Sequence, residues 1–325
     1  MLKAAIYGVG RWGGHLIESV RDSAKIRVVA GITRNPDAHR ELAAKMGMQL
    51  RESYADALRD REIDAVLIAT PHSQHFEQIL QAAAAGKHVY VEKPMTLTRD
   101  TAQKAIDACR AAGVTLSIGF NRRQAPAFLE MARRIRAGEI GDVLHVEGHH
   151  SGAAGYRLKA GSWRSDRMEA PAGGMTARGI HTLDSMIQIA GLVRTVYAYS
   201  DRRKLGAGIE MDDTTSMLLK FDGGVTGYLG TLLVTAELWR VHVFGSKGWL
   251  EMRGPSDLVG RGLEGSPQKI ALPVINLETA TLEAFADAAT ARQPFVVPPD
   301  EAVNSIAVLE AIEASAASGA PVSIG

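Results

Sequence analysis

The sequence has little cysteine, little net charge and no long apolar run, and each shortage excludes a class of protein. Among 325 residues there is one cysteine, Cys109, so no internal disulfide can form. The formal net charge is +1 and like charges do not gather in long blocks, so no strong field attracts nucleic acid or an anionic membrane. No apolar run approaches the roughly 20 residues of a membrane helix, and the N-terminus lacks the pattern of a signal peptide. We therefore expect a cytoplasmic protein that acts on a small molecule.

The composition is that of a folded protein with more than one core. Apolar residues make up 46% of the chain and charged residues 22%, as in ordinary globular proteins. Single cores stop growing near about 250 to 300 residues. Because the chain is longer than that and its pattern changes near residue 120, we expect two domains, residues 1–121 and 122–325.

The first domain alternates between short apolar runs and amphipathic segments. The apolar runs predict strands at 4–8, 26–32, 65–70, 88–92 and 115–119. The amphipathic segments predict helices at 13–20, 36–46, 73–85 and 98–112. Strands that alternate with helices of this length form a parallel sheet covered on both faces. The expected fold is α/β, a doubly wound Rossmann domain.

The second domain has longer alternating segments joined by glycine turns, which are typical of antiparallel strands. We predict strands at 142–150, 194–199, 214–221, 225–234, 240–245 and 249–252, and helices at 126–137, 180–190, 277–291 and 301–317. This is an α+β domain with an open, mainly antiparallel sheet that serves substrate binding and oligomerisation. A large apolar sheet face marks an interface, so we expect a homodimer or homotetramer formed through that sheet.

A glycine-rich turn lies where a dinucleotide would bind in such a fold. Gly8, Gly10 and Gly13 enclose Arg11 and Trp12 in the pattern G-x-G-x-x-G, which closes the first predicted strand and opens the first helix. In that context the backbone can approach a pyrophosphate, and the helix N-terminus faces its charge.

The end of the second predicted strand bears on the choice of cofactor. An acidic residue there favours NAD, whereas this chain has Thr33 and Arg34. A guanidinium can bind a 2′-phosphate in a bidentate manner, so NADP is preferred over NAD. The alternative is that Arg34 is a solvated loop residue. Thr70 and Pro71 end the third predicted strand and are expected to line the nicotinamide side.

Glu92, Lys93 and Pro94 end the next strand, at the same edge of the sheet. A residue that precedes proline is held extended, so the Lys93 side chain can be directed toward the ligand. The alternative is an ordinary solvated lysine at a strand end.

Together these motifs resemble the glucose-fructose oxidoreductase and inositol dehydrogenase family, Gfo/Idh/MocA, over nearly the whole chain. The motifs that carry the resemblance are Gly8-Val9-Gly10-Arg11-Trp12-Gly13, Ala69-Thr70-Pro71-His72 with His75, Gly86-Lys87-His88-Val89-Tyr90-Val91-Glu92-Lys93-Pro94, Gly119-Phe120-Asn121-Arg122-Arg123, Gly138-Glu139-Ile140-Gly141, Gly173-Gly174 and Gly179-Ile180-His181-Thr182-Leu183-Asp184. The resemblance implies hydride transfer between a nicotinamide cofactor and an alcohol or ketone carbon, usually of a sugar or cyclitol. It also implies that Lys93 and His181 meet at the substrate hydroxyl.

The remaining site residues are expected from the same motifs. We expect His72, His75, Glu92, Lys93 and Asn121 at the cofactor, and Lys93, Arg123, Arg164 and His181 at the substrate.

The chemistry of alcohol oxidation agrees with these roles. The reaction needs a base for the proton and a cofactor for the hydride. A positive nicotinamide ring and nearby arginines would lower the pKa of Lys93 toward the working pH. His181 would hold the hydroxyl or relay its proton; the alternative is a structural histidine capped by Asp184.

The chain departs from the family pattern at one position. It has Ala177 where family members commonly carry Asp or Asn, which puts the usual sugar in doubt.

Other interpretations remain open at this stage. The cations Arg157, Lys159, Arg164 and Arg167 favour a carboxylated alcohol or a cyclic dihydrodiol, unless they only solvate a loop. A non-catalytic regulator that senses the dinucleotide is the other class, although it would not need Lys93 and His181 together. Neighbouring His149 and His150 would face opposite ways on a strand, and we expect no metal site.

Overall fold

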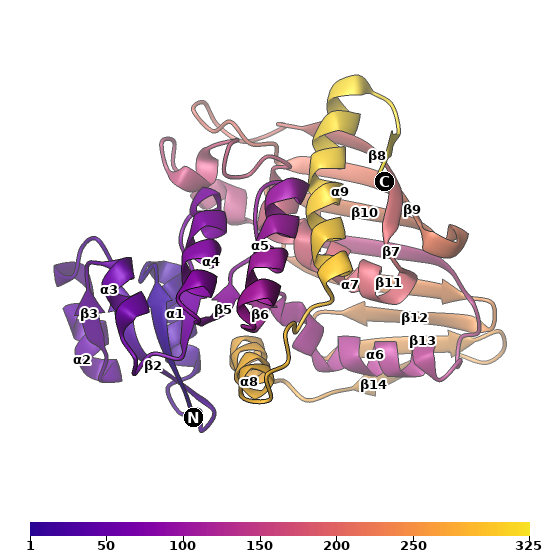
Figure 1. The fold of residues 1–325 in the computed structure, drawn as a ribbon. Coiled ribbons are helices and arrows are strands. Elements are labelled where there is room, and N and C mark those ends of the chain that lie inside the picture. Colours follow the sequence, from indigo (N-terminus) through magenta and orange to yellow (C-terminus); the bar gives the residue numbers. More distant parts are fainter. The chain divides into compact units, whose positions relative to one another are not determined.

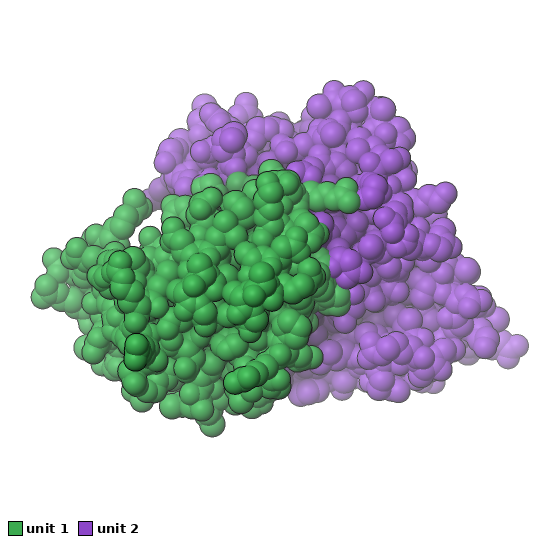
Figure 2. All heavy atoms as spheres, in the orientation of Figure 1, with its two compact units in different colours: residues 1–121, 276–299 green, residues 122–275, 300–325 purple.

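The structure is a computed structural model that describes residues 1–325 (Figure 1). Contacts divide the chain into two compact units, each drawn in its own colour in Figure 2. The first comprises Met1–Asn121 and Asn276–Pro299, and the second comprises Arg122–Ile275 and Asp300–Gly325. The sequence-based boundary placed 276–299 with the second domain, whereas here this segment packs in the first unit.

The returning segment forms helix α8 (Leu277–Thr290), and its buried face explains where it packs. Leu282, Phe285 and Ala286 enter the same hydrophobic core as strand β1 (Leu2–Tyr7). The rings of Phe285 and Tyr90 lie 5.9 Å apart.

The sheet of the first unit is parallel and has six strands in the order β3-β2-β1-β4-β5-β6. The strands after β1 are β2 (Ile26–Ile32), β3 (Gln49–Arg51), β4 (Ala65–Ile68), β5 (His88–Val91) and β6 (Leu116–Ile118). This order reverses between β1 and β4, and open α/β sheets bind ligands at the carboxyl ends of strands beside such a reversal. The predicted Rossmann fold is confirmed.

The helices of this unit follow the predicted positions. They are α1 (Arg11–Ser19), α2 (Arg40–Met46), α4 (His75–Ala84) and α5 (Arg99–Ala112), with a further short helix, α3 (Tyr54–Arg59), that was not predicted. Thr98 caps α5 by accepting from the Thr101 N–H, and Gly113 ends it at φ 65°. Figure 1 shows α4 and α5 side by side.

The second unit contains a nine-stranded sheet in the order β14-β13-β12-β11-β7-β10-β9-β8-β15. The strands are β7 (Val143–Ser151), β8 (Val193–Asp201), β9 (Thr214–Phe221), β10 (Thr226–Leu232), β11 (Leu238–Gly245), β12 (Gly248–Arg253), β13 (Asp257–Gly262), β14 (Gln268–Ala271) and β15 (Val322–Ser323). Every neighbouring pair is antiparallel except β7 and β10. The prediction of a mainly antiparallel sheet is confirmed, although β13, β14 and β15 were missed.

Helices α6 (Pro126–Arg136), α7 (Ile180–Ala190) and α9 (Pro299–Ser318) complete this unit. Helix α7 packs on β7 so closely that a Cβ at Gly148 would lie 2.6 Å from the Thr182 methyl carbon. The opposite face of the sheet presents Leu218 and Tyr199, which are 58% and 63% exposed. One face of the sheet is therefore covered within this chain, and the other carries exposed apolar side chains.

No helix of this structure is both long enough and apolar enough to cross a bilayer.

Candidate functional site

The three glycines of the first turn have three different structural tasks. Gly8 has φ 101°, and a Cβ there would lie 2.6 Å from the Ala69 carbonyl oxygen. A Cβ at Gly13 would collide with the Gly8 carbonyl oxygen, so this glycine allows close packing of α1 on the turn. A Cβ at Gly10 would meet nothing within 4 Å. This open backbone at the start of α1 is what a pyrophosphate requires.

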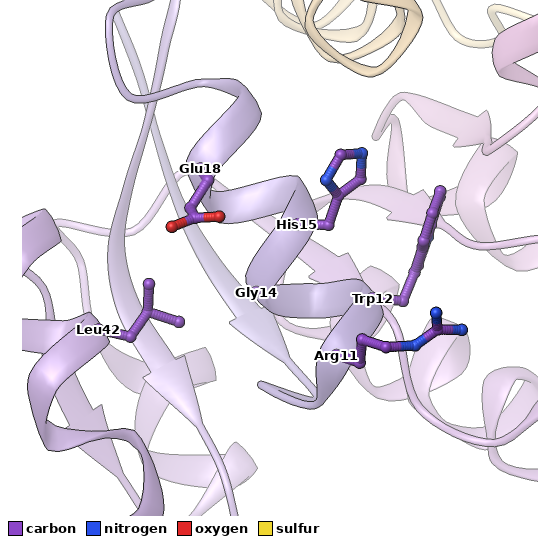
Figure 3. Close-up of a pocket in the computed structure, with 6 residues that line it drawn as sticks. All are labelled: Arg11, Trp12, Gly14, His15, Glu18 and Leu42. Atoms are coloured by element: carbon purple, nitrogen blue, oxygen red, sulfur yellow. The ribbon is translucent and has the colours of Figure 1, made fainter.

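A cavity of about 490 Å³ lies along α1 beside the turn. Figure 3 shows Arg11, Trp12 and His15 on one side of this helix and Glu18 with Leu42 on the other. The rings of Trp12 and His15 lie 5.1 Å apart. Arg11 is exposed in the first turn of the helix, where a cation adds to the attraction for phosphate.

At the end of β2, Thr33 and Arg34 differ in accessibility. Thr33 is buried, and its hydroxyl accepts a hydrogen bond from the Asn35 N–H at 3.2 Å. Arg34 is exposed, and no hydrogen bond or ion pair in the structure engages its guanidinium. The cation is therefore accessible to a ligand at this strand end.

At the end of β4, helix α4 fixes Thr70 through two side chains. The Thr70 hydroxyl donates to Gln78 Oε1 at 2.6 Å. His75 is fully buried, and its Nε2 and Nδ1 lie 3.0 Å from the Thr70 carbonyl oxygen and 2.9 Å from that of Pro94. His75 was predicted at the cofactor, whereas both of its ring nitrogens have partners in the protein backbone. Pro71 and His72 follow Thr70 and are partly buried.

At the end of β5, Glu92 is buried and Lys93 is partly exposed. The Lys93 N–H donates to Glu92 Oε2 at 3.3 Å, and the Tyr90 hydroxyl donates to Oε1 at 3.4 Å. Burial raises the pKa of Glu92, while the Lys93 charge and the Trp12 indole N–H act against that shift. Glu92 thus lies beside both the glycine turn and Lys93.

Asn121 ends the first of the two segments that form the first unit. One polar atom of its side chain has a hydrogen-bond partner in the protein, and the other has none. Its Nδ2 donates to Glu278 Oε1 on α8 at 2.8 Å. Its Oδ1 is buried and has no hydrogen-bond partner within the protein. Because buried polar atoms are nearly always paired, this acceptor fits a donor group of a bound ligand such as a carboxamide. Together with the open backbone at Gly10, it shows that the residues present suit a nicotinamide dinucleotide.

In the second unit, His181 lies in the first turn of α7 and is 8% exposed. It follows a π-helical turn, Met175–Gly179, that contains Ala177; such turns occur frequently at functional sites. The ring of His150 lies 6.2 Å from that of His181 and also 6.2 Å from that of Trp239. The Arg122 guanidinium lies 5.0 Å from the Trp239 ring. These four side chains form the His181 cluster.

Arg123, predicted at the substrate, is occupied by two carboxylates. Its guanidinium donates to Asp184 at 2.6 and 2.9 Å and to Glu301 at 2.6 Å. Asp184 is 1% exposed; burial raises its pKa, and the Arg123 charge opposes that rise. The carboxylate of Asp184 therefore binds Arg123.

The four cations that favoured a carboxylated alcohol are all exposed. The Arg164 guanidinium lies 4.1 Å from the Trp163 ring. Arg167 pairs with Asp212 at 3.5 Å and Glu313 at 4.0 Å. No three His, Cys, Asp or Glu side chains come together in an arrangement suited to a metal ion.

Two family models cover most of the chain. Residues 2–120 match the oxidoreductase family with an NAD-binding Rossmann fold, and residues 128–251 match the Gfo/Idh/MocA C-terminal domain. The chain belongs to the Gfo/Idh/MocA oxidoreductase family. The resemblance inferred from the motifs is thereby confirmed.

Sequence identity to individual relatives is modest. The scyllo-inositol 2-dehydrogenase (NAD(+)) of Bacillus subtilis is 36% identical over 152 residues, which are 45% of this chain and 44% of that protein. The rhizopine catabolism protein MocA of Rhizobium meliloti is 28% identical over 95% of this chain and 93% of its own length. The aldose-aldose oxidoreductase of Caulobacter crescentus, solved with glycerol, has a TM-score of 0.89 at 25% identity and 99% coverage of both chains.

Membership decides between the two classes of function that the sequence left open. The protein is an oxidoreductase that uses a nicotinamide cofactor, as predicted, and the non-catalytic regulator is disfavoured. In this oxidoreductase, sequence reasoning missed His150 and Trp239 as neighbours of His181. His150 shares the covered face of β7 with Val146 and Gly148, and that alternation was the available signal.

Proposed function

We propose that this oxidoreductase transfers a hydride between nicotinamide and an alcohol or ketone carbon of a sugar, cyclitol or related polyol, with Lys93 as the proton acceptor. The observation that carries the proposal is the position of Lys93. It follows β5 and adjoins Glu92, which also lies beside Trp12 of the glycine turn. The three relatives described above support the substrate class, because their names are those of inositol, rhizopine and aldose proteins.

The residues that would hold the cofactor are those of the first unit. The Gly8–Gly13 turn and the N-terminus of α1 bind the pyrophosphate, and Asn121 Oδ1 accepts from the carboxamide. The bound nicotinamide supplies the hydride chemistry. Lys93 takes the proton of the substrate hydroxyl, and Glu92 holds the Lys93 backbone N–H.

The His181 cluster supplies the substrate contacts in this proposal. His181 holds the reacting hydroxyl, since a neutral imidazole can both donate and accept. Arg122 and His150 add polar contacts, and Trp239 offers an apolar ring face suited to the carbon side of a sugar ring. Arg123 stays with Asp184 and Glu301 and supports α7, which carries His181.

A second substrate class is supported by a different observation. Ala177 places a methyl group in the π-helical turn, and Arg157, Lys159 and Arg164 are exposed nearby in the sequence. A carboxylated alcohol or a cyclic dihydrodiol would need fewer hydroxyl contacts than a sugar. A panel of polyols, aldoses, hydroxy acids and dihydrodiols, assayed with both cofactors by formation of reduced nicotinamide, tests both classes. Turnover restricted to hydroxy acids would overturn the polyol proposal.

We also propose that NADP is preferred over NAD, because Arg34 is exposed and unpaired at the end of β2. Arg34→Ala is expected to weaken NADP binding by roughly tenfold or more, on the scale of a lost charge-assisted contact, and to change NAD binding little. Titration of both oxidised cofactors into wild type and variant measures this. Exposed Arg59, which pairs only with Asp56, provides the matched control Arg59→Ala. Equal losses for the two cofactors would contradict the preference.

For assembly, we propose a homodimer or homotetramer formed through the exposed face of the nine-stranded sheet. Leu218→Asp would place a charge in this apolar surface and is expected to reduce the mass measured by light scattering at micromolar concentration. Met168→Asp, at an even more exposed apolar position outside the strands, is the control. A monomeric wild type, or an oligomer unaffected by Leu218→Asp, would contradict this surface.

A further inference from the structure

His75 connects two segments that end neighbouring strands. Its ring nitrogens lie 3.0 Å from the Thr70 carbonyl oxygen, just after β4, and 2.9 Å from the Pro94 carbonyl oxygen, just after β5. The side chain is fully buried, so water does not compete for either contact. Strands β4 and β5 are paired, but their ladder ends at Ile68 and Val91. Beyond the ladder, the His75 ring lies within hydrogen-bond distance of both segments.

The ring is itself held by a rigid element. His75 is the first residue of α4, and the neighbouring His72 ring lies edge-on at 5.7 Å. Gln78, one turn later on α4, accepts from the Thr70 hydroxyl at 2.6 Å. Groups placed on helices and supported by further hydrogen bonds hold a site more accurately than free loops do.

The chemistry of the partners requires a donor at this position. Both carbonyl oxygens only accept hydrogen bonds. A neutral imidazole has one N–H and donates to one of them, whereas the protonated ring has two N–H groups on opposite sides of a planar frame and donates to both. A buried carbonyl left without a donor is costly. Few side chains can reach two backbone oxygens in this way and at the same time fill the space of a ring.

We propose that His75 is a positioning residue, which fixes the spacing between the Thr70 and Pro94 segments and thereby the backbone from which Lys93 projects. The role assigned to Lys93 rests on the proposed function, but the link between the two segments does not. Misplacement of a reacting group by about 1 Å can lower the reaction rate roughly 10²-fold. Loss of the link between the two segments is therefore expected to slow the reaction.

Two substitutions and one control separate positioning from general stability. His75→Phe keeps a ring but removes the two nitrogens that face the carbonyl oxygens, whereas His75→Gln keeps an amide that can donate to these oxygens. Tyr54→Phe removes another buried hydrogen bond on the same helix, in which the Tyr54 hydroxyl donates to the Gln78 carbonyl oxygen at 3.0 Å. That control leaves the Thr70 and Pro94 carbonyls untouched.

The first readout needs neither cofactor nor substrate. Hydrogen exchange followed by mass spectrometry should show peptides that span 69–74 and 92–97 exchanging about tenfold faster in His75→Phe than in Tyr54→Phe, because local opening depends on local contacts. His75→Gln should lie between the two. If His75→Phe and Tyr54→Phe exchange alike in both peptides, the proposal is overturned.

The second readout is turnover with the substrate found in the panel assay. His75→Phe should lower kcat roughly tenfold or more while the dissociation constant of the cofactor changes less than about threefold, and His75→Gln should recover part of the loss. Faster exchange in His75→Phe together with a wild type that oxidises nothing would retain the link and reject the proposed function. Normal exchange and normal kcat in His75→Phe, with an active wild type, would reject the link and retain the function.

Discussion

Replacement of Lys93 by methionine is expected to lower turnover by roughly 10²-fold or more, the usual scale for loss of general acid-base catalysis. Cofactor affinity should change little, because the glycine turn and the N-terminus of α1 hold the phosphates. Steady-state turnover and a separate titration with the oxidised cofactor measure the two effects independently. Lys104→Met, at an exposed lysine that pairs only with Asp100, is the matched control and should behave as wild type.

His181→Ala extends this test to the second unit. A similar loss of turnover is expected, and the double variant should lose much less than the product of the two single losses, since residues that act as one unit are not additive. Normal turnover in Lys93→Met would show that the lysine before Pro94 has a structural or cofactor-contacting role instead. Strictly multiplicative losses would show that Lys93 and His181 act independently.

Arg123→Met is expected to cause the largest loss of stability, about 3 to 5 kcal/mol, the cost of breaking a buried ion pair by removing one partner. The Arg123 and Asp184 side chains are 11% and 1% exposed, so the substitution leaves a buried carboxylate without its cation. Denaturant unfolding followed by circular dichroism measures the free energy of unfolding in wild type and variant.

Two further variants show whether this loss comes from the unpaired carboxylate. Arg123→Met combined with Asp184→Leu should recover part of the stability, because the buried charge is removed as well. Arg133→Met removes an exposed arginine that pairs with Glu130 and Glu139, and it should have little effect. A double variant less stable than Arg123→Met would show that Asp184 has another essential partner.

The fold could be predicted where the pattern of apolar residues was long enough. The strand predicted at 26–32 and the helix predicted at 180–190 match β2 and α7, because each has a clear periodicity and a clear end. Strand β3 has three residues and α3 has six, too few to show a period. Helix α8 was predicted as a helix but assigned to the wrong neighbours, because periodicity identifies a buried face without identifying what covers it.

For the candidate site, too, features that depend on residues close in sequence could be predicted, and contacts between residues far apart in sequence could not. The glycine turn and Lys93 could be proposed from the sequence because their chemistry depends on neighbours in sequence. Arg123 bonds to Asp184 and Glu301, which are 61 and 178 residues away, and no local pattern distinguishes that pairing from a substrate contact. His75 likewise lies 19 residues from Pro94, so its contact with the Pro94 carbonyl oxygen became visible only in the structure.

Transfer of deuterium from the substrate carbon to the nicotinamide tests the central claim most directly. A polyol identified in the panel assay, labelled with deuterium at the oxidised carbon, would be turned over in the presence of oxidised cofactor, and the reduced cofactor would be analysed by mass spectrometry. The account predicts one deuterium per reduced nicotinamide, a slower reaction with the labelled substrate, and formation of the deuterated cofactor roughly 10²-fold more slowly in Lys93→Met. Reduced cofactor without deuterium, or no reduction with any polyol or aldose and either cofactor, would contradict it.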